Sequence, residues 1–306
     1  MDKPIHDFCR LGIVHFMAFP QCMKGEGPIL ETVTRIAEDP FFTAVEITWI
    51  RDDTVRDQVR RVLRDAGCAY TYGAQPPLLS QKLDLNHPEP AERNRAIAQV
   101  LECAGEAADV GASAVAVLSG KVPEDGDVPA AEQRLADSLI QIGERTERLG
   151  IGLTLETFDC QPFGKNCLIG PTHNAVRLAE TVKKQVPRFG LMLDLSHLPL
   201  LDETPRQALG AAKEHLVHAH MGNCLFSDPN HPAYGDEHPF FGAEGSCNGA
   251  AELAEYLRAL MEVGYLAPGG QRILSFEVKP IVTWGQTSED AIQNCKDTLA
   301  AAWVMV

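Results

Sequence analysis

The chain has 306 residues, of which 45% are hydrophobic and 23% charged, and this composition excludes a disordered, collagen-like or low-complexity protein. Its length allows one large domain or two small ones. The net charge of −15 and the lack of an 18-residue apolar run or an apolar leader disfavour nucleic-acid and membrane partners, so we expect a cytoplasmic protein that acts on small molecules.

Eight short apolar runs, each followed by a stretch with helical periodicity, set the pattern of the chain. They span residues 11–16, 44–49, 69–73, 114–118, 151–156, 190–194, 216–221 and 273–278. Continuous apolar strands that alternate with helices are typical of a parallel sheet covered on both faces. Eight such units predict an α/β protein of the (β/α)₈ TIM-barrel class, with residues 1–306 forming a single domain.

The helices between these runs are clearest at residues 91–110, 132–149 and 172–186. A glycine between helix and strand recurs at positions 67, 111, 150 and 190, as expected where a loop closes on a helix-ending glycine. A doubly wound open sheet is less well supported, because no GxGxxG or GxxxxGK[ST] turn is present. The glycine-rich residues 242–249 follow no strand, and we expect them to form a flexible loop.

Polar residues stand at the carboxyl ends of the predicted strands, where a barrel directs them into one shared site. They are His15, Glu46, Glu156, Asp194, His218, His220 and Glu277. The last four strands each supply one group, namely Glu156, Asp194, His220 and Glu277, and three carboxylates with one imidazole would repel one another without a cation. We therefore expect one divalent metal ion, preferably Mn²⁺, with Mg²⁺ or Co²⁺ as alternatives.

The sequence resembles the sugar phosphate isomerase/epimerase-like, or xylose isomerase-like, TIM barrels, which include D-tagatose 3-epimerase, xylose isomerases and endonuclease IV. The resemblance is clearest at residues 85–118 and from residue 151 onward. It implies that Glu156, Asp194, His220 and Glu277 hold the metal and that Glu156 and Glu277 act as catalytic base and acid. Asp194 and His197 match an Asp-x-x-His pattern whose His contacts substrate. His218 and His220 match a His-x-His pattern whose second His binds the metal.

The sequence departs from the epimerase pattern at positions that touch substrate in that family. Asp159 and Pro162 replace an Asn and a Glu after Glu156, and Asn223 replaces a Glu after His220. Residues 228–242 are similar to a subset of these barrels that act on oxidised sugars, and His231, Asp236 and His238 are candidates to line the pocket. The expected substrate contacts are His15, Glu46, His197, His218, Asn223, His238 and Trp284.

The resemblance implies a metal-dependent isomerase or epimerase that abstracts a proton next to the carbonyl of a keto sugar through a metal-stabilised enediolate. The alternative is a metal-dependent lyase that cleaves 3-keto glycosides, including carbon-glycosides, by β-elimination. A homo-oligomer or a small partner subunit is compatible with either reaction. An endonuclease is opposed by the net charge of −15, and a barrel that only binds a sugar is the non-catalytic alternative.

Overall fold

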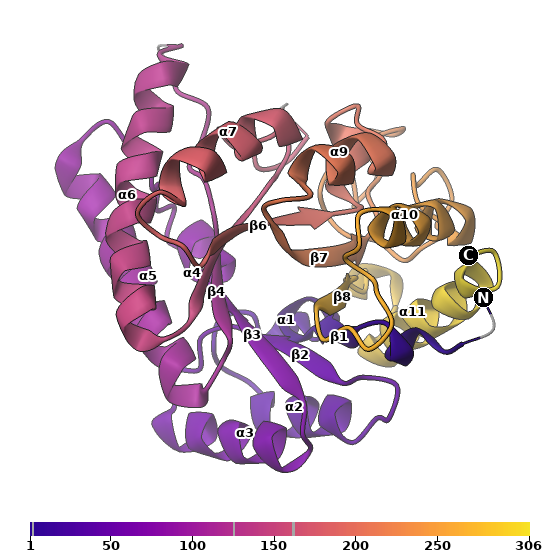
Figure 1. The fold of residues 1–306 in the computed structure, drawn as a ribbon. Helices are drawn as coiled ribbons and strands as arrows, with labels where there is room; N and C mark the ends of the chain where they lie inside the picture. Colours follow the sequence, from indigo (N-terminus) through magenta and orange to yellow (C-terminus); the bar gives the residue numbers. More distant parts are fainter. Residues whose placement is uncertain (2, 125, 161–162) are drawn as a thin grey trace.

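The computed structural model, which describes residues 1, 3–124, 126–160 and 163–306, is a closed barrel of eight parallel strands (Figure 1). The strands are β1 (Arg10–Val14), β2 (Ala44–Ile47), β3 (Ala69–Gly73), β4 (Ala114–Leu118), β5 (Gly152–Glu156), β6 (Phe189–Asp194), β7 (Leu216–Gly222) and β8 (Ile273–Glu277). Each strand pairs with its neighbour in sequence, and β8 closes the barrel on β1. The predicted TIM-barrel class is confirmed.

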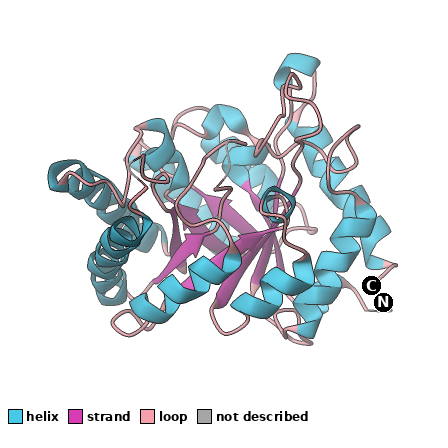
Figure 2. Ribbon diagram, turned by 90° about the horizontal axis from the view of Figure 1, so that it is seen from above, coloured by secondary structure: helices cyan, strands magenta, loops and turns pink. Residues whose placement is uncertain are grey.

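Helices surround the strands on the outside, as the view from above shows most clearly (Figure 2). The α-helices are α1 (His15–Ala18), α2 (Ile29–Ala37), α3 (Asp53–Asp65), α4 (Gln75–Ser80), α5 (Pro90–Val110), α6 (Val128–Leu149), α7 (Thr172–Val182), α8 (His197–Leu200), α9 (Pro205–Ala212), α10 (Ala250–Glu262) and α11 (Ser288–Trp303). Short 3₁₀ helices form at η1 (Ile5–Asp7), η2 (Pro20–Cys22) and η3 (Val282–Trp284). None of the described helices is long and apolar enough to cross a bilayer.

Local sequence signals place most of these boundaries. Gly111 and Gly150 end α5 and α6 in the left-handed conformation, with φ of 87° and 77°, as the helix-glycine-strand pattern predicts. Gly190 differs, because it lies inside β6, where an added Cβ would come within 2.4 Å of the Val217 side chain on β7. This glycine therefore serves close strand packing.

The structure corrects three predicted boundaries. β1 ends at Val14, so His15 begins α1 and does not end a strand. α7 ends at Val182, four residues before the predicted end, and β2 ends at Ile47, two residues before the predicted end. Residues 242–249 form a loop without helix or strand in the structure, as predicted.

The two ends of the chain lie side by side on the outside of the barrel (Figures 1 and 2). The indole Nε1–H of Trp303, the last residue of α11, donates a hydrogen bond to the backbone oxygen of Lys3 at 2.7 Å. The Trp303 ring also packs edge-on against Phe8, with ring centroids 5.6 Å apart. These contacts fasten the last helix over the start of β1.

Candidate metal centre

Four polar side chains from four neighbouring strands converge at the carboxyl end of the barrel. Glu156, Asp194 and Glu277 are the last residues of β5, β6 and β8, and His220 lies two residues before the end of β7. One ligand atom from each of the four lies within 4.8 Å of all the others, and the group is buried or nearly so. The structure thus brings together the four residues that were expected to share a cation.

In two of the carboxylates, one oxygen accepts a hydrogen bond from a neighbouring residue and the other oxygen has no hydrogen-bond partner. Glu156 Oε2 accepts a hydrogen bond from Gln75 Nε2 at 2.8 Å, and Asp194 Oδ1 accepts one from the Ser196 amide at 2.8 Å. Glu156 Oε1 and Asp194 Oδ2 are buried and have no hydrogen-bond partner. Buried polar atoms are rarely left in this state, so these oxygens fit a bound cation.

The imidazole of His220 is also held in position by a hydrogen bond to a neighbouring side chain. Its Nε2 lies 3.0 Å from Glu46 Oε1, which also accepts from His218 Nε2 at 2.6 Å. Burial would raise the pKa of Glu46, but the two imidazoles outweigh it and hold that pKa well below its usual range. With its Nε2 proton donated to Glu46, His220 presents Nδ1 to the cluster, 2.7 Å from Glu277 Oε2 and 3.6 Å from Glu156 Oε1.

The chemistry of the four residues fits a divalent metal ion. Burial raises the pKa of Asp194, although the neighbouring imidazoles of His197, His238 and His220 oppose this shift. Three carboxylate oxygens and one imidazole nitrogen form a donor set suited to Mn²⁺, Mg²⁺, Co²⁺ or Zn²⁺, with positions left for substrate oxygens. The described residues can therefore hold a divalent ion at this point.

A second buried network lies beside the four residues and is centred on Asp236, in the loop between β7 and α10. Asp236 Oδ1 accepts from His197 Nε2 at 3.1 Å and from His238 Nε2 at 2.9 Å, and Oδ2 forms an ion pair with Lys165 Nζ at 3.1 Å. Burial opposes ionisation of Asp236, but these cations, Lys165 first, hold its pKa well below the usual range. The sequence-predicted His197 and His238 are thus joined by one carboxylate.

His197 has no lone pair to offer a metal. Its Nδ1 lies 2.6 Å from the Thr157 carbonyl oxygen, which only accepts, and its Nε2 faces the Asp236 carboxylate, so both nitrogens donate. Burial lowers the pKa of a histidine, yet Asp236 outweighs it and raises the pKa of His197 to about 10. The group Asp194, His197 and His238 therefore is not a second metal site, despite its compact geometry.

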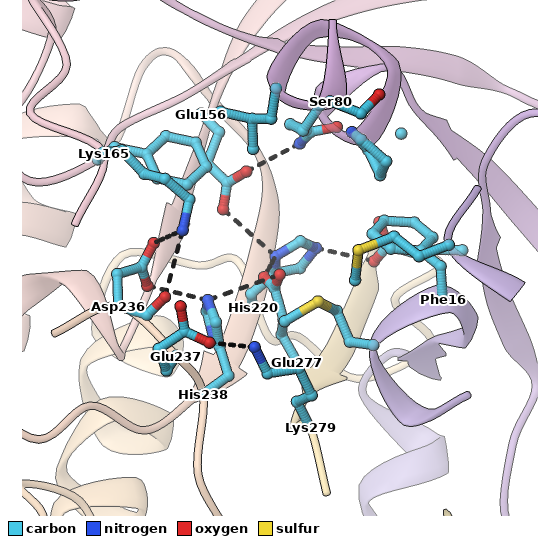
Figure 3. Close-up of a pocket in the computed structure, with 18 of the residues that line it drawn as sticks. Phe16, Ser80, Glu156, Lys165, His220, Asp236, Glu237, His238, Glu277 and Lys279 are labelled. Carbon is cyan, nitrogen blue, oxygen red and sulfur yellow. Dashed lines mark hydrogen bonds and ion pairs between the residues drawn. The ribbon is translucent and has the colours of Figure 1, made fainter. Parts of the chain in front are cut away.

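A cavity of about 370 Å³ opens above the four convergent residues. One wall is polar and contains Lys165, Asp236, Glu237, His238 and Lys279, whereas Phe16 lies across the cavity from this polar wall (Figure 3). The apolar lining is completed by Met17, Met23, Leu79 and Phe158. His238 holds a left-handed backbone conformation, with φ of 51°, which is strained for a residue with a side chain.

Three predicted substrate contacts lie away from this cavity. His15 is buried against Thr32, with Nε2 2.8 Å from its Oγ1, and desolvation lowers its pKa to about 3. Asn223 is buried in the loop after β7, where its amide donates to the Phe240 oxygen and to Ser246. Trp284 is 57% exposed and packs edge-on against His231, outside the cavity. Glu46 and His238 do line the cavity, and His218 lies behind it on Glu46.

Among the residues of the site that the sequence did not indicate are Gln75 and Lys165, which contact Glu156 and Asp236. Gln75 begins α4 two residues after β3, and a polar side chain so close to a strand end was the available signal. Lys165 follows the departures from the family pattern at Asp159 and Pro162. Asp159 is buried and accepts the backbone amides of Lys165 and Asn166 at 3.0 and 2.9 Å, whereas Pro162 lies outside the described residues.

Comparisons with known proteins agree with this architecture. The family model of the xylose isomerase-like TIM barrels matches residues 36–298. A D-psicose 3-epimerase from Clostridium cellulolyticum H10 superposes with a TM-score of 0.70 at 16% identity, covering 96% of this chain and 98% of its own. A 3-keto-D-glucoside 4-epimerase from E. coli gives a TM-score of 0.65 at 16% identity, covering 97% and 99%.

The IolI protein, in a structure that contains a zinc atom, gives a TM-score of 0.72 at 16% identity, covering 96% of this chain and 98% of its own. No curated protein sequence matches the chain. At these identities the structural likeness demonstrates a shared fold, and the activity has to be argued from the site.

Proposed function

Because the chain belongs to the xylose isomerase-like TIM barrel family, we propose that it is a metal-dependent sugar isomerase or epimerase that moves a proton on the carbon next to a carbonyl. One observation carries the proposal: four ligand groups meet at the base of a cavity, and three of them, Glu156, His220 and Glu277, line it from β5, β7 and β8. The names of the 3-epimerase and 4-epimerase neighbours support a sugar substrate.

The chain's own residues divide the work of such a reaction. A divalent ion, Mn²⁺, Mg²⁺ or Co²⁺, would act as a Lewis acid on a carbonyl and a neighbouring hydroxyl, which acidifies the C–H bond between them. Glu156 and Glu277 come from strands three positions apart, so they can meet a bound sugar from different sides, one removing the proton and the other returning it. Gln75 holds Glu156 in place through a 2.8 Å hydrogen bond.

The cavity supports this chemistry by orientation and by excluding water. Phe16 and Phe158 both line the cavity, and their rings present an apolar surface against which the C–H face of a sugar can pack. The polar wall, which lies across the cavity from Phe16, supplies hydrogen-bond partners for hydroxyls (Figure 3). A bound sugar would therefore contact both walls while its carbonyl end meets the four ligand groups.

The proposal is tested by solvent exchange. The protein, loaded with Mn²⁺ or Mg²⁺, is incubated with a panel of ketoses and 3-keto sugars in D₂O, and incorporation of deuterium next to the carbonyl is followed by NMR. Exchange that depends on the metal and is lost on chelation is expected. Lack of exchange across the panel, with the metal bound, would contradict the proposal.

The apolar lining favours a second candidate, a lyase that releases an apolar group from a 3-keto glycoside by β-elimination. Met17, Met23 and Leu79 extend the apolar surface beyond Phe16, which suits a substrate with a non-sugar portion. Both reactions begin with the same proton removal, and they differ in whether a leaving group departs. Chromatographic detection of an aglycone released from a 3-keto glycoside distinguishes the lyase reaction from isomerisation or epimerisation. Adding cell extract to the assay tests whether the lyase reaction needs a partner subunit.

A further inference from the structure

We propose that Lys165 and Asp236 act as a donor and acceptor pair that recognises one hydroxyl of the substrate, on the carbon chain away from the oxygens that meet the four metal-ligand candidates. The pair would then determine which sugars are accepted. This inference rests on the proposed function, because it assumes a sugar in the cavity. It concerns the polar wall of the cavity, to which the proposed metal-dependent reaction assigns no specific role.

The Lys165 ammonium is fixed in position and has a donor left over. Its Nζ lies 3.2 Å from the backbone oxygen of Asp236 and 3.1 Å from Asp236 Oδ2. An ammonium group has three N–H donors, so two contacts leave one for another partner. The side chain lines the cavity and is 23% exposed, and Asp159 holds the Lys165 backbone amide at 3.0 Å.

Asp236 has a complementary acceptor left over. Its side chain is fully buried, and Oδ1 already receives the N–H groups of His197 and His238. Oδ2 pairs with Lys165 by charge, yet it has no aligned hydrogen-bond donor. A carboxylate oxygen of this kind on a cavity wall can accept a hydrogen bond from an incoming hydroxyl.

A sugar hydroxyl satisfies both groups, because its oxygen accepts from Lys165 while its proton is donated to Asp236. The charge of Lys165 is balanced by the adjacent Asp236, which favours a neutral hydroxyl over an anionic group. His197 cannot take this role, because both of its nitrogens are occupied and, unlike Asp236, it does not line the cavity. The substrate contact that the sequence resemblance assigns to His197 thus passes to Lys165 and Asp236 in this chain.

The experiment compares Lys165→Met and Lys165→Arg with Lys213→Met, in which the lysine is exposed and follows α9, away from the cavity. Each protein is loaded with Mn²⁺, and Mn²⁺ affinity confirms an intact ligand group. Sugar binding is measured by calorimetry, and solvent exchange gives KM and kcat, for the best ketose of the panel and each of its monodeoxy analogues. Lys165→Met should weaken binding of the parent sugar by about 10- to 100-fold and raise KM more than it lowers kcat.

One monodeoxy analogue should bind the wild-type protein and Lys165→Met with similar affinity, because it lacks the recognised hydroxyl. Lys165→Arg should recover part of the loss, and Lys213→Met should match the wild-type protein. The inference is overturned if Lys165→Met binds the parent sugar within twofold of wild type, if all analogues lose affinity equally, or if no sugar binds. Lys165-dependent binding without any solvent exchange would uphold the inference and refute the proposed enolisation chemistry.

Discussion

Replacing Glu46 by Gln removes the charge that faces the Nε2 atom of His220. Glu46 is 4% exposed, and its Oε1 accepts from His218 at 2.6 Å and from His220 at 3.0 Å. A glutamine oxygen can keep one of these contacts but carries no charge, so it polarises His220 less and orients it less firmly. Loss of such an outer partner of a metal ligand reduces metal affinity by about 10- to 100-fold, or about 1.4 to 2.7 kcal/mol.

The affinity is measured by calorimetric titration of the metal-free protein with MnCl₂. Glu106→Gln is the matched control, because Glu106 is a half-buried glutamate that accepts the Ile50 amide at 2.7 Å and does not line the cavity. Glu46→Asp distinguishes the effect of the charge from the effect of side-chain length. The shorter side chain keeps the negative charge but moves the carboxylate oxygen away from His220. A Mn²⁺ affinity of Glu46→Gln within twofold of the Glu106→Gln value would refute the role assigned to Glu46.

The remaining predictions concern the same cluster and one core histidine. Glu156→Gln and Glu277→Gln should each reduce solvent exchange by about 100-fold or more at saturating Mn²⁺, measured by NMR, and exchange near the wild-type rate would exclude that glutamate as base or acid. Elemental analysis should find one divalent ion per chain, and two would contradict the assignment of His197 as a double donor. Between pH 7 and pH 5 the unfolded chain protonates His15, with an ordinary pKa of about 6.5, while the folded chain does not, because burial lowers the pKa of His15 to about 3. Stability should therefore fall by about 2 kcal/mol over this range from His15 alone, and urea unfolding of His15→Gln should lack this part of the fall.

The residues that the sequence predicts best are those whose position follows from the strand pattern alone. Glu156 and Asp194 end their apolar runs and Glu277 is the last residue but one of its run, and a charge at that point marks where a buried strand reaches the edge of the barrel. Parallel strands bring their carboxyl ends to one edge, so local information is enough to gather these side chains. The bounds of β3 and β4 match the prediction for the same reason.

The residues that the sequence predicts poorly depend on contacts between distant loops. Lys165 meets Asp236 across 71 positions of sequence, and Gln75 meets Glu156 across 81, so no local pattern marks either pair. His15 shows how small the margin is. Because β1 ends at Val14, two residues earlier than predicted, the imidazole turns to Thr32 on α2 and away from the cavity. A shift of two residues at a strand end redirects a side chain, and periodicity does not fix that boundary.

The negative charges of the site fall into two groups, Asp236 on the polar wall and the three carboxylates of the candidate metal centre. The two groups differ in how their charge is balanced by neighbouring cations. Asp236 carries its own cations, since Lys165, His197 and His238 all face it. Glu156, Asp194 and Glu277 have ligand oxygens within 4.8 Å of one another, so each pair of charges repels by at least about 3 kcal/mol at an effective dielectric constant of 20. His220 and His238 face these three carboxylates, with His238 3.7 Å from both Asp194 and Glu277, but His238 also pairs with Asp236. The carboxylates outweigh the burial of His220 and raise its pKa well above the usual range. A divalent ion held by Glu156, Asp194, His220 and Glu277 would remove the remaining repulsion and take the place of a proton on His220 Nδ1, so its binding would also stabilise this end of the barrel.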